Sequence, residues 1–173
     1  DKVFIHSKTG TIHTPEGVSV GEGSGTPNRL REICEISLKR LGVDYLDAMC
    51  QSRVDPTIPI EESVGEVSRL VEEGKVRFIG LSEAAPDTVR RAAVIHPLVS
   101  LQFEYSLWTR DVEDGHQKAC NELNMALMAY APLGYGFLTG AISHAGAQSD
   151  TDIRGKFPRF HEENFMANRK RVS

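Results

Sequence analysis

Five short apolar runs in this 173-residue sequence each lead into polar or aromatic side chains that can bind a small molecule. Lysine supplies a cation, while serine and glutamine supply hydrogen-bonding groups and tyrosine supplies a ring for stacking. Polar residues commonly follow strands, so one such exit means little. If the ends of all five apolar runs face the same opening, their side chains favour a partly aromatic ligand pocket. The candidates are Lys8, Ser52, Ser82, Glu83, Gln102 and Tyr130.

A glycine-rich stretch at residues 131–138, APLGYGFL, is a second candidate for ligand binding. Gly134 and Gly136 allow close approach of a ligand, and their free N–H groups can hold a phosphate. A plain turn explains the stretch at least as well. No G-x-G-x-x-G lies between a strand and a helix, so the nucleotide-binding pattern of open sheets is not present.

Composition and spacing argue against several other chemistries. The six histidines are scattered, so we expect no bound metal, and no G-x-S-x-G surrounds Ser52 to make it a nucleophile. The net charge of -4 favours neither nucleic acid nor anionic lipid, and no apolar run is long enough to span a membrane. We expect Cys34, Cys50 and Cys120 to be reduced core residues, which fits a cytoplasmic protein.

The elements that must position these residues follow from hydrophobic periodicity. Pro27 opens a helix that Gly42 ends, while residues 9–26 and 143–173 read as irregular. A later helix is expected to be capped by Asp111. Predicted strands cover 3–5, 45–50, 76–81, 98–102 and 125–129, and predicted helices cover 27–41, 60–71, 86–94 and 111–122.

Alternation of apolar strands with helices predicts parallel βαβ units and the α/β class. The pattern alone does not separate an open sheet from part of a (β/α)8 barrel. A complete barrel needs roughly 250 residues, so this chain is too short for one. We expect a single partial domain over residues 1–173, with open sheet edges that favour a homo-oligomer.

Five stretches in the same order resemble the aldo-keto reductase family, especially its branch related to potassium-channel β subunits. They are 37–47 (SLKRLGVDYLD), 51–56 (QSRVDP), 70–82 (LVEEGKVRFIGLS), 101–108 (LQFEYSLW) and 129–140 (AYAPLGYGFLTG). The resemblance implies a (β/α)8 TIM barrel, of which this chain spans about the third to the seventh strand. It also implies NADPH as cofactor and hydride transfer to a small-molecule aldehyde or ketone.

The resemblance carries over unevenly to the catalytic residues. Lys8 matches the lysine that assists the tyrosine acting as general acid in the family. Ser52 stands where the family has a histidine. A serine hydroxyl can donate to a carbonyl oxygen but cannot titrate near neutral pH. The family's aspartate and tyrosine are expected upstream of Asp1. The cofactor-binding matches are Ser82, Glu83 and Gln102 for the carboxamide, Tyr130 for stacking, and Leu133, Gly134, Gly136 and Leu138 for the pyrophosphate.

Two functions from different classes follow. The first is an NADPH-dependent carbonyl reductase, seen in part or impaired. The second is a non-catalytic nucleotide-binding or regulatory subunit on the same fold, which the serine at position 52 favours. An unrelated phosphate-binding α/β domain is the remaining alternative.

Overall fold

The computed structural model describes residues 3–9, 12–14, 17–19, 23–146 and 152–170. The chain forms two compact units. Unit 1 comprises Asp1–Phe103 and Val112–Met128, and unit 2 comprises Glu104–Asp111 and Ala129–Ser173. Each unit is described by itself.

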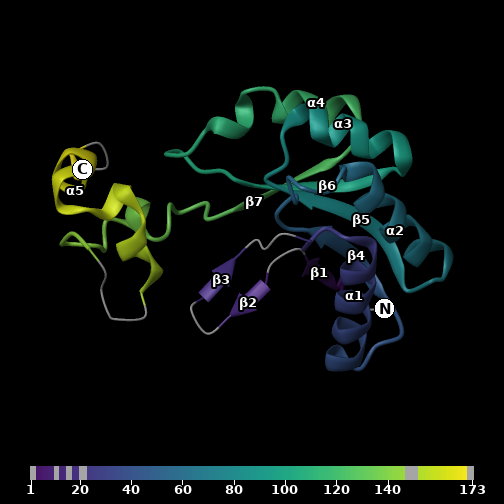
Figure 1. The fold of residues 1–173 in the computed structure, drawn as a ribbon. Helices are drawn as coiled ribbons and strands as arrows, with labels where there is room; N and C mark the ends of the chain where they lie inside the picture. Colours follow the sequence, from purple (N-terminus) through teal and green to yellow (C-terminus); the bar gives the residue numbers. More distant parts are fainter. Residues whose placement is uncertain (1–2, 10–11, 15–16, 20–22, 147–151, 171–173) are drawn as a thin grey trace. The chain divides into compact units, whose positions relative to one another are not determined.

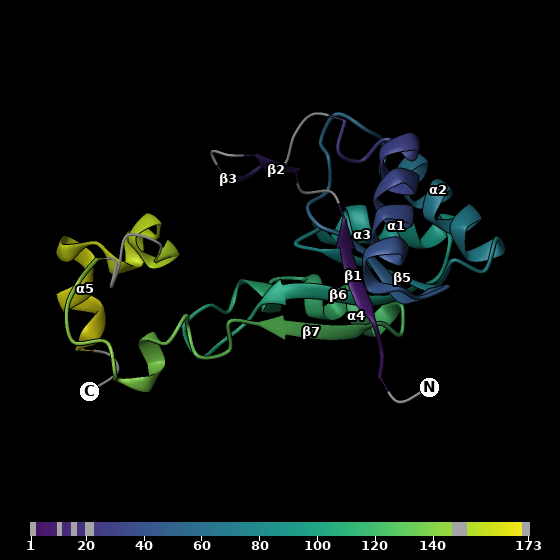
Figure 2. The same ribbon diagram turned by 90° about the horizontal axis from the view of Figure 1, so that it is seen from below.

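A five-stranded sheet with the order β1-β4-β5-β6-β7 is the centre of the fold (Figure 1). The pairs β1–β4, β4–β5 and β5–β6 are all parallel, and β6 and β7 run side by side (Figure 2). This confirms the predicted α/β class with parallel strands. The strands are β1 (His6–Thr9), β4 (Leu46–Gln51), β5 (Val76–Ser82), β6 (Leu98–Glu104) and β7 (Ala126–Tyr130).

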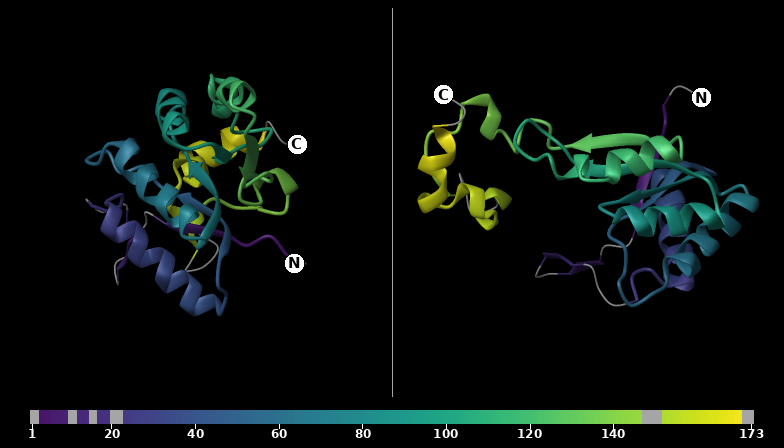
Figure 3. Two further views of the ribbon diagram at one scale, coloured as in Figure 1. Left: turned by 90° about the vertical axis from the view of Figure 1, so that its right-hand side faces the viewer. Right: turned by 90° about the horizontal axis from the view of Figure 1, so that it is seen from above.

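Four helices connect these strands and lie along one side of the sheet (Figure 3, left). Pro27 and Pro86 begin two of them, where the missing N–H leaves no bond unmade. Gly42 ends the first helix in the left-handed conformation, with φ of 67°. The helices are α1 (Pro27–Leu41), α2 (Ile60–Glu72), α3 (Pro86–Ile95) and α4 (His116–Glu122).

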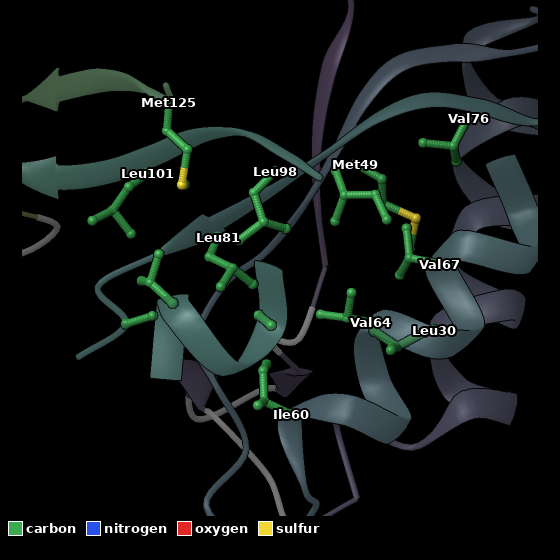
Figure 4. Close-up of a cluster of buried hydrophobic side chains, with 14 of the residues drawn as sticks. Leu30, Met49, Ile60, Val64, Val67, Val76, Leu81, Leu98, Leu101 and Met125 are labelled. Carbon is green, nitrogen blue, oxygen red and sulfur yellow. The ribbon is translucent and has the colours of Figure 1, made fainter. Parts of the chain in front are cut away.

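The main hydrophobic core lies between this helical layer and one face of the sheet (Figure 4). Leu30 of α1 and Val64 and Val67 of α2 meet Met49 and Leu81 of the sheet, all at most 2 % exposed. A register shift beside Ile79 and Gly80 pairs them with Leu98 and Ser100. Because of this irregularity, Leu98 and Leu101 both reach the helical side although they are three positions apart in the strand.

Unit 2 has its own aromatic core. The Phe137 ring packs edge-on against Trp108, Phe160 and Phe165, with centroid distances of 4.2, 5.8 and 5.5 Å. Arg159 Nη1 lies 2.8 Å from Glu104 Oε1. This ion pair joins the two segments of unit 2, Glu104–Asp111 and Ala129–Ser173. The short elements are η1 (Asp111–Glu113), η2 (Phe137–Thr139), η3 (Ile153–Lys156), η4 (Pro158–Phe160) and α5 (Glu162–Arg169).

Four predictions about the elements were wrong. The first strand begins at His6 rather than residue 3, and part of the expected 9–26 loop forms the antiparallel pair β2 (Ile12–Thr14) and β3 (Gly17–Ser19). Asp111 opens η1, whereas α4 begins after Gly115. The expected irregular tail contains α5 and half of the aromatic core. In the part of the chain that the structure describes, no helix is long and apolar enough to cross a membrane.

Candidate functional site

Lys8 and Ser52 lie at the carboxyl ends of two neighbouring parallel strands. Lys8 is exposed on β1 and is the register partner of Cys50 on β4. Ser52 follows β4, is 7 % exposed, and donates its main-chain N–H to the Thr9 carbonyl oxygen over 2.5 Å. The structure thus brings together the two predicted catalytic residues at one edge of the sheet.

Ser82, Glu83 and Gln102 gather at the same edge, on β5 and β6. Ser82 is 1 % exposed and is the register partner of Gln102. Glu83 has φ of 55°, and its N–H donates to the Gln102 carbonyl oxygen over 2.9 Å. Its carboxylate oxygen Oε2 lies 3.3 Å from Nη1 of Arg53, the residue after Ser52. This ion pair therefore joins the β4 exit to the β5 exit.

The Gln102 amide has a vacant acceptor. Its Nε2 donates to the Met128 Sδ over 3.4 Å, whereas its Oε1 is buried and has no hydrogen-bond partner within the described residues. A buried amide oxygen that accepts no hydrogen bond lowers the stability of the fold. Such an atom is therefore a candidate contact for a ligand that carries a donor. The amide of a nicotinamide presents an N–H donor, which the Gln102 Oε1 acceptor fits.

A second polar cluster surrounds Gly80 of β5 and contains Ser100 of β6 and His6 of β1. A Cβ atom at Gly80 would lie 2.7 Å from Ser100 Oγ and 3.5 Å from His6 Nε2, so a side chain there would displace its neighbours. Both polar atoms are buried and lack a partner among the described residues. Burial and the nearby Lys8 lower the pKa of His6. Sequence reasoning missed this cluster because it depends on the register of β5 with β6.

Asp55 anchors the loop that carries Ser52, and sequence reasoning missed it as well. Its carboxylate is 1 % exposed and accepts from Gly25 N at 3.1 Å, Thr57 N at 2.9 Å and Thr57 Oγ1 at 2.6 Å. Burial alone would raise the pKa of Asp55, but these hydrogen bonds outweigh it and hold the pKa below its ordinary value. The Asp-Pro-Thr sequence of a turn was the available signal.

The remaining predicted residues belong to unit 2. Tyr130 ends β7, and its carbonyl oxygen accepts from Tyr105 N at 3.2 Å. Residues 131–140 form consecutive tight turns, with Gly134 at φ of 58° and Gly136 at 89°. The expectation of free glycine N–H groups is wrong. Gly134 donates to Ala131 O at 2.8 Å, and Gly136 and Leu138 donate to Leu133 O at 3.1 Å each. These three N–H groups are therefore not available to an anion at the loop.

Among the described residues, no group of three or more His, Cys, Asp or Glu side chains is arranged to hold a metal ion. The titratable groups of the site are instead a lysine, a paired carboxylate and a histidine of lowered pKa. Together with hydroxyl and amide groups, they suit an organic ligand with polar substituents.

Comparison with known proteins identifies the relatives of this chain. It is 48 % identical over 145 residues to "Probable aldo-keto reductase 1" of Glycine max, covering 84 % of this chain and 42 % of that protein. Glycerol dehydrogenase AKR11B4 of Gluconobacter oxydans shares the fold with a TM-score of 0.86 at 27 % identity, over 99 % of this chain and 53 % of that one. The thermostable aldo-keto reductase Tm1743 gives 0.62 at 32 % identity, over 64 % of this chain and 42 % of that one.

The chain thus spans about half the length of the relatives it matches. The fold match confirms the prediction of an incomplete (β/α)8 barrel. The family pattern described as "Aldo/keto reductase family" matches residues 1–170, nearly the whole chain. With that match and the close relative in Glycine max, this chain belongs to the aldo/keto reductase family.

Proposed function

We propose that this protein binds NADPH and reduces an aldehyde or ketone to an alcohol. The observation that carries the proposal is the Gln102 Oε1, which has no hydrogen-bond partner in the described part of the chain. It lies beside Ser82, at the edge that also holds Lys8 and Ser52. An acceptor for the nicotinamide amide then stands on the same edge as donors for a carbonyl oxygen. Family membership supports a nicotinamide cofactor and oxidoreductase chemistry.

When bound, NADPH supplies the hydride that the carbonyl carbon accepts. The residues at the edge act on the oxygen. The Ser52 hydroxyl donates a hydrogen bond to it, and the Lys8 ammonium stabilises the negative charge that develops there. Because serine does not titrate near neutral pH, Ser52 donates a hydrogen bond but does not supply the proton. Ser82, Glu83 and Gln102 orient the carboxamide.

Leu133, Gly134, Gly136 and Leu138 are assigned to the cofactor pyrophosphate, and Tyr130 to stacking on the nicotinamide. These assignments rest on the resemblance of residues 129–140 to the family. The backbone supports close approach at the two glycines, because no Cβ projects from the turn there.

A non-catalytic nucleotide-binding subunit is the second candidate, favoured by serine in the histidine position. Two measurements on the purified protein separate the candidates. Titration with NADPH, followed by its fluorescence, reports binding. Loss of NADPH absorbance with a simple aromatic aldehyde reports turnover. Binding with turnover supports the reductase, binding without turnover supports the subunit, and no binding would refute both.

Location and assembly are part of the same proposal. We place the protein in the cytoplasm, supported by three free cysteines that are all buried. We also propose that the two compact units belong to one partial domain and that the protein self-associates. The self-association is supported by β1 and β7 as the outer strands of the sheet. Analytical ultracentrifugation over a range of protein concentrations tests the assembly, and a monomer at all concentrations would refute it.

A further inference from the structure

A layer of three residues in unit 1 lies one step deeper in the sheet than part of the candidate site. On each of three strands, a residue of the layer stands two positions before a residue of the site. Side chains two positions apart on a strand point to the same face of the sheet, so the layer and the site share one face. The pairs are His6 and Lys8 on β1, Gly80 and Ser82 on β5, and Ser100 and Gln102 on β6.

Glycine at position 80 leaves a space that polar atoms surround. The position that a Cβ atom would take there lies 2.7 Å from Ser100 Oγ, 3.3 Å from the Ser100 carbonyl oxygen and 3.5 Å from His6 Nε2. A carbon atom this close to the hydroxyl would clash with it, whereas the two oxygens of an O–H···O bond commonly lie about 2.7 Å apart. The surroundings of this space therefore suit a hydrogen-bonding group rather than a methyl group.

Two of these polar atoms have hydrogen-bonding capacity that the protein does not use. Ser100 is 4 % exposed, and both its Oγ and the His6 Nε2 are buried with no hydrogen-bond partner in the described ranges of the chain. The two atoms do not bond to each other, yet the space at Gly80 is close to both. One molecule in that space can bond to both of them, and native structures leave few buried polar atoms unbonded.

Water is the molecule that matches this space. Buried waters make about three hydrogen bonds to polar groups that the protein leaves unsatisfied, and three polar atoms surround the space here. Burial and the nearby Lys8 lower the pKa of His6, so its ring is neutral at neutral pH. Because water both donates and accepts, it can bond to a neutral imidazole nitrogen and to a hydroxyl whichever of the two carries the proton.

We propose that His6, Gly80 and Ser100 form a binding site for one water molecule, which bridges His6 Nε2 and Ser100 Oγ. The bridge links β1 to β6, which are not neighbours in the sheet order β1-β4-β5-β6-β7. It therefore holds the curvature of the sheet across these strands, and with it the spacing of Lys8 from Gln102. This inference does not depend on the proposed function.

Ser100→Ala gives opposite results with and without the water. Deleting a hydroxyl that bonds to water loses a hydrogen bond, whereas deleting a hydroxyl that bonds to nothing removes an unsatisfied group and stabilises the fold. We expect the equilibrium constant for unfolding, measured with urea, to rise roughly twofold to tenfold. An unchanged or lower constant in Ser100→Ala overturns the inference.

Ser63→Ala is the matched control for the loss of a buried, bonded hydroxyl. Ser63 is 1 % exposed and its Oγ donates to the Gly25 carbonyl oxygen over 2.7 Å. We expect its unfolding constant to rise by a factor similar to that of Ser100→Ala. The comparison calibrates the size of the effect, while the direction of the change in Ser100→Ala decides for or against the water.

NMR of the wild-type protein gives a direct readout that stands even if Ser100→Ala fails to fold. Cross-relaxation between water and ring protons detects a long-lived water beside a histidine, and His6→Phe assigns the His6 signals. We expect a cross-peak of the sign that marks a bound water at His6 and none of that sign at the exposed ring of His161. Absence of this cross-peak at His6 overturns the inference. Both experiments are made without NADPH, so their outcome is separate from that of the cofactor titration.

Discussion

The main-chain N–H of Glu83 donates to the carbonyl oxygen of Gln102 over 2.9 Å. This bond extends the pairing of β5 with β6 one residue beyond Ser82 and sets the turn in which Glu83 takes φ of 55°. Three predicted cofactor-binding residues on two strands are thereby tied together by the backbone. The side chain at position 83 must therefore tolerate the left-handed conformation.

Substitution of Glu83 separates backbone strain from loss of its ion pair. Asparagine adopts the left-handed conformation readily, whereas a β-branched residue does not. We expect Glu83→Val to be less stable than Glu83→Asn by about 1–2 kcal/mol. Both variants remove the carboxylate that faces Arg53, so each controls for that loss. Urea unfolding measures the difference, and equal midpoints would contradict the strain argument.

Gln102→Met tests whether the vacant Oε1 is a ligand contact. Methionine has similar length and no amide acceptor. We expect NADPH affinity to fall by roughly twofold to tenfold, the effect of one neutral hydrogen bond. Stability should stay constant or rise slightly, because a buried atom without a partner is removed. Gln117→Met, on the exposed side of α4, is the matched control. Unchanged affinity in Gln102→Met would remove Gln102 from the site.

Ser52→His restores an imidazole at the position where serine stands. We expect carbonyl reduction to rise at least tenfold in protein that carries the family tyrosine, because positioned acid–base groups contribute about 10²–10⁴-fold. Ser52→Ala, which only deletes the hydroxyl, should lower the rate. No rise in Ser52→His with NADPH binding intact would show that position 52 does not carry the catalytic role.

Local sequence patterns predicted most of unit 1. Pro27, Gly42 and the apolar spacing between them specify α1 without help from distant residues. The aromatic core of unit 2 could not be predicted in this way. Trp108, Phe137, Phe160 and Phe165 come from separate segments and show no common period, so only the folded chain brings them together.

The site was predictable where it depends on strand direction alone. Parallel strands place Lys8, Ser52 and Gln102 at one edge whatever the register. The contacts around Gly80 depend on a register shift between β5 and β6, which no local sequence pattern predicts. The internal hydrogen bonds of the glycine-rich loop likewise depend on turn types that glycine permits but does not dictate.

Asp55→Asn should weaken the fold in a pH-dependent way. Asp55 has a lowered pKa in the folded protein, so its stabilising effect is present above the unfolded pKa near 4 and is lost as pH falls through the folded pKa. We expect a loss of about 1–3 kcal/mol at neutral pH, from a buried network left with a weaker acceptor.

The control for Asp55→Asn is Asp87→Asn, which changes an exposed carboxylate paired only at the surface. Unfolding by urea at several pH values gives the comparison. The difference between wild type and Asp55→Asn should shrink toward pH 3. A constant difference across this range would mean that the Asp55 charge does not support the loop.

The three thiols should resist modification in the folded protein. Burial raises the pKa of Cys50 to about 12, and burial also raises the pKa values of Cys34 and Cys120. Because the thiolate is the reactive form, we expect negligible reaction with a disulfide reagent at pH 8. In denaturant all three should react, with the count given by the absorbance of the released thiol. Rapid reaction of one thiol without denaturant would show that its part of the core opens readily.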